Sequence, residues 1–204
     1  MMNRTIYTIG YSGFPLNAFI QELKKHSISV VVDVRSSAYS ERYPDYNKPS
    51  LQQALKQVGI YYRNYTSEFG ARQEDRSFYS PEGYLDFELF SKSNQFQSGV
   101  AKMINSTEKG YIIAFMCAEK EPIQCHRAIL VARAFDKLGF TVIHLMPNGI
   151  SKDQKTIEEE LLKKYFPNIN QLSLFDNRLP EEEYINAAYR KQNEQIGYHL
   201  EEEV

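Results

Sequence analysis

Both cysteines of the chain lie in one short stretch, MCAEKEPIQCHR, and its residues that could do chemistry are Cys117, Glu119, Cys125, His126 and Arg127. An apolar run before Cys117 predicts the end of a strand, and the Cys-His-Arg triplet opens a helical pattern. Exposed N–H groups and the dipole at a helix N-terminus favour anions and lower the pKa of a nearby thiol. The stretch therefore predicts an anion-binding or thiol-containing catalytic site. The alternative is that the cysteines simply pack as small apolar residues at the top of a sheet.

The same stretch offers three soft metal ligands, namely Cys117, Cys125 and His126. Their spacing matches no closed structural zinc site, and the sequence has neither a C-x2-C pair nor an obvious fourth ligand. We therefore expect no metal and no cofactor.

A second group of polar residues follows the β-branched run ISVVVDVR. Asp33 and Arg35 alternate at its end, so both side chains can reach one cleft while Val34 points to the core. We expect Arg35, together with Arg127, to bind phosphate and either Asp33 or Glu119 to act as a general acid or base. The alternative is an Asp-Arg pair that only orders the strand end.

A tyrosine-rich basic loop comes next, and a charged loop surrounds Gly70. Arginine beside tyrosine suits phosphates and unpaired bases, although a charged loop is more often a solvated surface. The residues expected to contact phosphate or nucleic acid are Ser12, Tyr39, Arg42, Tyr43, Tyr46, Lys48 and Arg72.

The elements that must position these residues alternate in type along the chain. Hydrophobic patterns predict strands over 4–10, 28–35, 60–65, 110–117 and 140–146, and helices over 15–26, 49–59, 83–106, 123–139 and 152–165. This order predicts a three-layer, Rossmann-like α/β fold, with a mostly parallel five-stranded sheet and helices on both faces. Ligands bind outside the carboxyl ends of such strands, so the predicted site lies in the loops 10–14, 33–48, 66–76 and 117–124.

We expect one α/β domain over residues 1–166 and a tail over 167–204 that ends in an acidic helix. Within the tail, QLSLF resembles the pentapeptide with which bacterial repair and replication proteins dock on the DNA polymerase sliding clamp. The expected clamp contacts are Gln171, Leu172, Leu174 and Phe175, with the last two filling an apolar pocket. The alternative is that this apolar segment packs on its own domain.

The composition sets limits on the function. The chain has 204 residues, a hydrophobic share of 42% and a net charge of -2, so it lacks the global positive field of many nucleic-acid binders. No apolar stretch approaches the roughly 20 residues that span a bilayer. The N-terminal stretch does not have the layout of a signal peptide, and two cysteines do not make a disulfide framework, so we expect a cytoplasmic protein.

Four motifs carry a family resemblance: YTIGYSG, VVDVRSSAYSERYPDYNK, SEFGARQ and, most specifically, MCAEKEPIQCHR. Over about residues 4–146 the chain resembles domain-of-unknown-function family 488. It departs from the family pattern at Tyr11, where a histidine is usual, and at residues 68–71, where a Leu-Gly-Gly run is typical. The resemblance implies an α/β domain with a cleft built from these motifs, and it implies no particular reaction.

Taken together, the residues predict a DNA-associated repair or nucleic-acid-processing protein that the tail recruits to the sliding clamp. Its expected partners are the clamp and, more weakly, nucleic acid, with no membrane. One alternative is a noncatalytic module that binds a nucleotide or nucleic acid. A rhodanese-like thiol enzyme is less favoured, because Glu119 and Glu121 raise a thiol pKa and repel an anionic sulfur donor.

Overall fold

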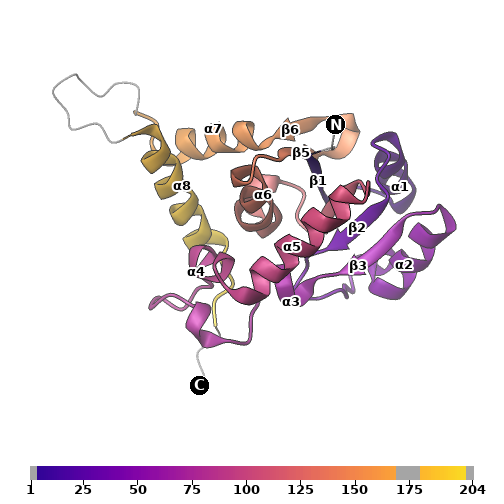
Figure 1. Cartoon of the computed structure of the whole chain (residues 1–204), viewed down its shortest axis with the longest axis horizontal. Coiled ribbons are helices and arrows are strands. Elements are labelled where there is room, and N and C mark those ends of the chain that lie inside the picture. Colours follow the sequence, from indigo (N-terminus) through magenta and orange to yellow (C-terminus); the bar gives the residue numbers. More distant parts are fainter. Residues whose placement is uncertain (1–3, 169–179, 201–204) are drawn as a thin grey trace.

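The computed structural model describes residues 4–168 and 180–200, so the predicted clamp motif at residues 171–175 lies outside the described part (Figure 1). Its centre is a six-stranded sheet in the order β3-β2-β4-β1-β5-β6. The strands are β1 (Thr5–Gly10), β2 (Val30–Asp33), β3 (Tyr61–Asn64), β4 (Ile113–Cys117), β5 (Thr141–Leu145) and β6 (Ser151–Asp153). The first five run parallel and only β6 pairs antiparallel, at the edge beside β5. The expected α/β fold with a mostly parallel sheet is confirmed, with one short strand more than predicted.

Both faces of the sheet are apolar, as a sheet covered on both sides requires. Along β4, Ile113, Phe115 and Cys117 belong to one core cluster, whereas Ala114 and Met116 belong to the other. This alternation follows from the two-residue period of a strand. The buried centre of the sheet therefore holds the strand ends that carry the predicted site.

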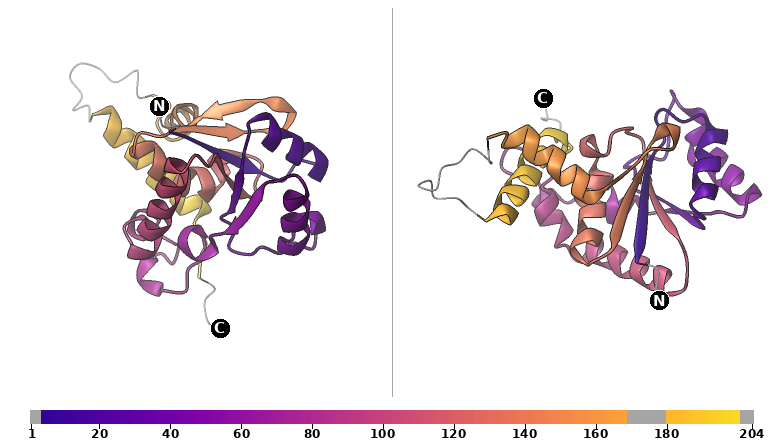
Figure 2. Two further views of the ribbon diagram at one scale, coloured as in Figure 1. Left: turned by 45° about the vertical axis from the view of Figure 1, so that its right-hand side comes forward. Right: turned by 90° about the horizontal axis from the view of Figure 1, so that it is seen from above.

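One face is covered by α1 (Leu16–Lys25) and α2 (Lys48–Gln57), and the other by the remaining long helices (Figure 2). The predicted helix over 83–106 is two helices, because Ser93 caps a new start by accepting a hydrogen bond from the N–H of Phe96. The face of the sheet opposite α1 and α2 is covered by a second layer of helices, namely α3 (Thr66–Phe69), α4 (Phe87–Ser91), α5 (Asn94–Glu108), α6 (Arg133–Lys137), α7 (Gln154–Tyr165) and α8 (Glu181–Ile196).

The segment after β4 differs most from its prediction as one amphipathic helix. It forms a 3₁₀ turn at Pro122–Gln124, a π-helical segment at Arg127–Ala132 and then α6. Every residue of the π-helical segment is buried, because α4 and α8 pack against it in addition to the sheet. A π-helical segment inside a helix is often found at a functional site.

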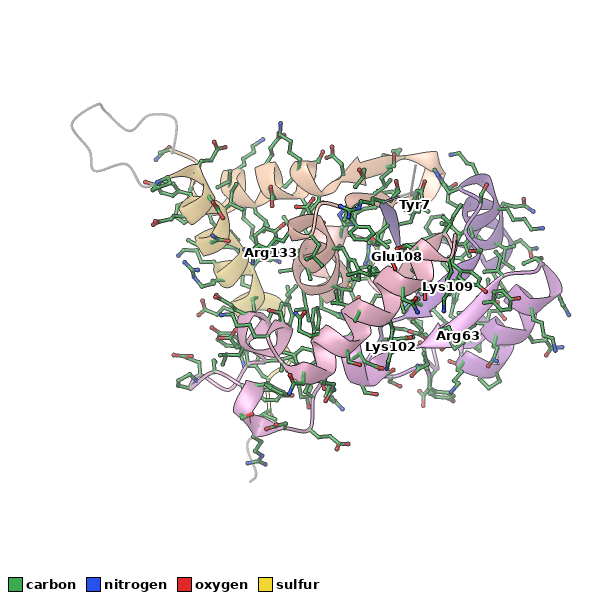
Figure 3. The ribbon with its side chains drawn as sticks, in the orientation of Figure 1. Tyr7, Arg63, Lys102, Glu108, Lys109 and Arg133 are labelled. Atoms are coloured by element: carbon green, nitrogen blue, oxygen red, sulfur yellow. The ribbon has the colours of Figure 1, made fainter. Side chains whose placement is uncertain are left out.

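Helix α8 packs on the rest of the chain. Ala188 and Tyr189 are buried in the same cluster as the helices of the second layer. The Tyr189 hydroxyl accepts a hydrogen bond from Gln154, and the guanidinium of Arg133 lies 3.7 Å from the centre of the Tyr189 ring. Figure 3 labels Arg133, whose side chain lies between α6 and α8. The predicted boundary after residue 166 stays a prediction, but α8 shares its core with the residues before that boundary.

No helix in the described ranges is long and apolar enough to cross a membrane.

Candidate functional site at the carboxyl edge of the sheet

The central strands β1 and β4 end side by side, with Gly10 in register with Cys117. From β1 the chain crosses over to β2, whereas from β4 it crosses in the opposite direction to β5. Such a reversal opens a crevice outside the strand ends. A cavity of ≈ 310 Å³ lies there, lined by Tyr11, Arg35, Ser36, Ser37, Tyr39, Ser40, Ala71, Cys117, Ala118, Glu119, Gln124, Cys125, His126 and Ile196. The loops after β1, β2, β3 and β4 all contribute to this lining.

Arg35 is held rigidly on one wall of the cavity. Its Nε and Nη2 atoms donate to the two carboxylate oxygens of Asp33, at 2.9 and 2.6 Å, and the side chain is 4% exposed. Burial opposes the charge, but the hydrogen bond and the charge of Asp33 raise the pKa of Arg35 above its ordinary value. Tyr11 also lies beside the guanidinium, with its ring centre 5.2 Å from Cζ, and contributes to the raised pKa, whereas Nη1 is buried and makes no geometrically good hydrogen bond to the described residues. The guanidinium therefore keeps one donor group unused beside the cavity.

Asp33 has a positioning role. It is fully buried and also accepts hydrogen bonds from the backbone N–H of Arg35 and from the Tyr62 hydroxyl. Burial and the Asp33 charge raise the pKa of Tyr62, so its hydroxyl stays protonated and donates. Asp33 does not line the cavity, so the geometry disfavours the predicted role as a general acid or base and fits the alternative of an ordered ion pair.

The tyrosines of the predicted basic loop differ in burial: Tyr46 is buried, Tyr43 is half-buried and Tyr39 is exposed. Tyr46 stacks on Tyr11 with ring centres 4.4 Å apart and donates its hydroxyl to the carbonyl of Phe14. The ring of Tyr43 meets Tyr11 edge-on at 5.4 Å. The geometry disfavours the predicted base contact of Tyr46, because its ring is already covered, whereas Tyr39 is 66% exposed and lines the cavity.

The two cysteines and His126 converge on another part of the lining. The Glu119 carboxylate oxygen Oε2 lies 3.0 Å from the Cys117 sulfur and 2.9 Å from the Cys125 sulfur. The Cys117 sulfur is 3.9 Å from Nδ1 of His126, whose Nε2 donates to the carbonyl of Val34 at 2.8 Å. The structure thus brings together four of the predicted catalytic residues.

The pKa values of this cluster shift because its members are buried against one another. Burial, with the neighbouring Cys125 and Glu119, raises the pKa of Cys117, and burial likewise raises that of Glu119. Burial would also raise the pKa of Cys125, but the hydrogen bond from Cys117 and the charges of Arg127 and His126 outweigh it and lower the pKa. Any negative charge on the sulfur pair is therefore favoured at Cys125.

Arg127 does not face the cavity, contrary to the expectation that it binds phosphate. It is fully buried and donates to the carbonyl oxygens of Glu119 and Lys120. These bonds use the guanidinium to hold the loop after β4 in place. Arg127 is thus a positioning residue for Glu119.

The other predicted phosphate contacts lie outside this cavity. The Ser12 hydroxyl is 3.2 Å from the Tyr43 hydroxyl, and the exposed residues Arg42 and Lys48 are not in the lining. Arg72 lies over the ring of Tyr198 and lines a larger groove of ≈ 880 Å³. Ser36 lines both spaces, so the groove adjoins the cavity.

Sequence reasoning missed Tyr62, which holds Asp33 from outside the cavity, and several residues of the cavity lining. Tyr62 sits opposite Val31 in the β2–β3 register, and its reach to Asp33 depends on that pairing. The small polar residues Ser36, Ser37 and Ser40 follow Arg35 directly and could have been found from the loop position alone. Ile196 comes from the end of α8, and no local signal links it to this edge.

Comparison with known proteins fits this placement. The family described as "Domain of unknown function DUF488" matches residues 15–134, which contain Arg35, Cys117, Glu119 and the Cys-His-Arg triplet. Neither the curated proteins nor the solved structures include a significant match to the chain. The family match covers more than half of the chain, and the protein therefore belongs to the DUF488 family.

Proposed function

We propose that the protein is a nucleic-acid-associated factor whose cleft binds a phosphate group of a nucleotide or of a nucleic-acid strand. One observation carries the proposal, namely the buried Nη1 group of Arg35, which has no partner among the described residues and belongs to a side chain lining the cavity. A buried donor without a partner costs about 1–3 kcal/mol, and more when it is charged. A phosphate oxygen bound at Nη1 would remove that cost.

The surroundings of Arg35 suit a phosphate. Asp33 fixes the plane of the guanidinium, so little side-chain entropy is lost when an anion binds. Hydroxyl groups of Ser36, Ser37 and Ser40 line the same cavity and can donate to phosphate oxygens. The exposed ring of Tyr39 offers a surface for an unpaired base.

The adjoining groove favours a strand over a free nucleotide. It shares Ser36 with the cavity and has a volume of ≈ 880 Å³. Its charged lining residues are the cations Arg72 and Arg76 and the acids Glu74 and Asp75, so a strand would have to follow the arginine side. A polymer with one phosphate at Arg35 could continue along it, with Arg72 as a second cationic contact. We therefore favour single-stranded nucleic acid or a strand end as the ligand.

Recruitment to the sliding clamp belongs to the same proposal. With a net charge of -2 the chain has little long-range attraction for nucleic acid. A tether on the clamp raises the effective concentration of DNA and can replace intrinsic affinity. The QLSLF segment supports this part of the proposal through its sequence alone.

A thiol-transfer function receives less support from the geometry. Cys117 and Cys125 are 3% and 1% exposed, and both contact the Glu119 carboxylate. A thiol that attacks or carries sulfur needs access to its substrate. We therefore rank that alternative below phosphate binding.

The test is a fluorescence-anisotropy titration of a 5′-phosphorylated single-stranded oligonucleotide labelled at its 3′ end. Arg35→Lys keeps the charge but loses the forked geometry, so we expect binding to weaken about tenfold to a hundredfold, the equivalent of about 1.5–3 kcal/mol. Arg63→Lys is the matched control, because Arg63 is exposed on β3 and absent from the lining of both spaces. Equal affinity of the wild type and Arg35→Lys, with both folded, would refute the proposal.

A second variant separates a strand from a single nucleotide. Arg72→Gln should reduce the slope of log affinity against log salt by about 0.7 for the oligonucleotide. The affinity of a mononucleotide, measured by its competition with the labelled oligonucleotide, should not change, because a mononucleotide fills only the cavity and does not reach Arg72 in the groove. An equal effect on both ligands would contradict the path along the groove.

A further inference from the structure

We infer that Cys117, Cys125, His126 and Glu119 bind a zinc ion on the wall of the cavity. This inference differs from the sequence-based expectation of no metal, which followed from the spacing of the two cysteines and His126. It goes beyond the proposed function and does not depend on it, because it rests on the donor atoms of these four residues alone.

The three soft donors already lie at coordination spacing. One ligand atom from each of Cys117, Cys125 and His126 lies within 4.8 Å of the other two, and all three residues are buried. Tetrahedral zinc, with Zn–S about 2.3 Å and Zn–N about 2.0 Å, places sulfur and nitrogen ligands about 3.5 Å apart. The 3.9 Å between the Cys117 sulfur and Nδ1 of His126 needs only a small movement to meet that spacing. Thiolate and imidazole donors together favour zinc over magnesium or calcium.

His126 is oriented as a metal ligand would be. A carbonyl oxygen only accepts, so Nε2 carries the hydrogen that bonds to Val34, and Nδ1 faces Cys117. Metal-ligating histidines nearly always donate their other ring N–H to a carbonyl or a carboxylate, which fixes the ring. The bond to Val34 is such a contact, made from the end of β2 to a ring on the loop after β4.

The compact group of donors has three members, and Glu119, which lies beside it, would supply the fourth ligand that the sequence did not make obvious. Its Oε2 atom contacts both sulfur atoms, at 3.0 and 2.9 Å. Without a metal both thiols can donate hydrogen bonds to this carboxylate, and with zinc the same oxygen and the two deprotonated sulfur atoms would share the ion, whose charge offsets their mutual repulsion. Arg127 holds the backbone of Glu119 from the opposite end of the residue, through the carbonyl oxygen.

The ion would contribute to the cleft as well as to the fold. All four zinc-binding residues line the cavity that contains Arg35. A zinc ion would therefore add positive charge to the wall that faces a phosphate bound in this cavity. On binding, each thiol releases its proton to solvent, so affinity falls at low pH.

The first test uses the wild-type chain, purified without a metal-chelating tag. We expect about one zinc per chain by mass spectrometry of the metals, and X-ray absorption that shows two sulfur neighbours. Less than a tenth of an equivalent of zinc after incubation with zinc and dialysis would overturn the inference, as would a Cys117–Cys125 disulfide in the reduced-buffer preparation.

The second test assigns the ligands with cobalt(II) as a spectroscopic probe. Cys117→Ser, Cys125→Ser and His126→Gln should each weaken cobalt binding by more than about tenfold, because loss of even an outer-shell partner of a metal ligand costs about that much. Glu119→Gln should weaken it and alter the visible spectrum, whereas Glu121→Gln, an exposed acid two residues along, should change neither. A Glu119→Gln protein that keeps the wild-type cobalt spectrum and affinity would overturn the assignment of Glu119 as the fourth metal ligand. Phosphate binding is measured separately, so failure of either proposal leaves the other standing.

Discussion

The backbone of Glu119 passes so close to Gly10 that a side chain at Gly10 has no room. A Cβ atom there would overlap the carbonyl oxygen of Glu119 and would lie 3.0 Å from Nη1 of Arg127. Gly10 ends β1 and pairs with Cys117 at the end of β4. The glycine thus lets the loop after β4 cross the end of β1 and carry Glu119 to the two cysteines.

Gly10→Ala should therefore damage the site and lower stability. Overpacking of this kind costs about 1–3 kcal/mol, and relief requires the loop that holds Glu119 to move. We expect weaker oligonucleotide and zinc binding together with a lower free energy of unfolding. The control is Gly110→Ala, where the added Cβ meets nothing within 4 Å. Because Gly110 has a left-handed backbone at φ +87°, alanine there should lower the free energy of unfolding but leave oligonucleotide and zinc binding unchanged. Normal ligand binding by Gly10→Ala would contradict this role of the glycine.

Arg127→Lys should destabilise the protein although it keeps the charge. A single ammonium group cannot hold the carbonyl oxygens of Glu119 and Lys120 in the forked geometry of a guanidinium. One buried carbonyl left without a donor costs about 1–3 kcal/mol, which urea unfolding measures. Arg190→Lys, at a site whose side chain is 60% exposed, should change stability by less than about 0.5 kcal/mol. A similar small change for Arg127→Lys would mean that the loop does not depend on this contact.

His144 makes stability depend on pH. It is fully buried, and its Nδ1 accepts a hydrogen bond from the Thr8 hydroxyl. Its Nε2 donates to the side-chain amide oxygen of Gln154. Burial and the charge of Arg127 lower the pKa of His144 to about 3, although contacts with Gln154, Cys125 and Asp153 oppose the shift.

Below the ordinary histidine pKa the unfolded chain binds a proton that the folded chain excludes, so stability falls as the pH drops. The loss is about 1.4 kcal/mol per pH unit between the two pKa values, or about 2 kcal/mol from pH 7.5 to about pH 5. His144→Gln cannot titrate, and urea unfolding at the two pH values should show a smaller loss for it. Identical losses in the two proteins would show that His144 does not cause the dependence.

The QLSLF segment predicts binding to the bacterial sliding clamp. Leu174→Ala/Phe175→Ala removes both apolar anchors and should weaken binding at least about tenfold, since anchor residues of this kind often contribute 2 kcal/mol or more. The matched control is Leu89→Ala/Leu138→Ala, two leucines that are 46% and 48% exposed outside the segment. Surface plasmon resonance with immobilised clamp measures all three proteins. Absence of wild-type binding would remove clamp recruitment from the account.

Much of the fold could be predicted from the sequence, because its elements have strong local signals. The β-branched run of β2 and the periodic pattern of α1 predict a buried strand and an amphipathic helix, and both are present. The edge strand β6 has three residues, and its last residue, Asp153, is also the N-cap of α7, so the pattern of the strand merges with that of the helix. The π-helical segment could not be predicted either, because its burial depends on α4 and α8 from elsewhere in the chain.

The loops that form the candidate site could be predicted from the sequence, but which of their residues face the cavity and which only support its walls could not. Parallel strand topology places Arg35 and Cys117 at one edge, and the structure has them on one cavity. The sequence cannot show that Arg127 turns inward to backbone carbonyls, or that Tyr46 is covered by Tyr11. These roles depend on tertiary contacts between segments that lie 30 or more residues apart, or on the turn that follows β4.

The most direct measurement of the central claim is a crystal structure of the protein with a 5′-phosphorylated dinucleotide. The account predicts a phosphate oxygen within hydrogen-bond distance of Nη1 of Arg35, with the Asp33–Arg35 pair unchanged. A dinucleotide bound through its phosphate elsewhere, with Nη1 of Arg35 still without a partner, would contradict it.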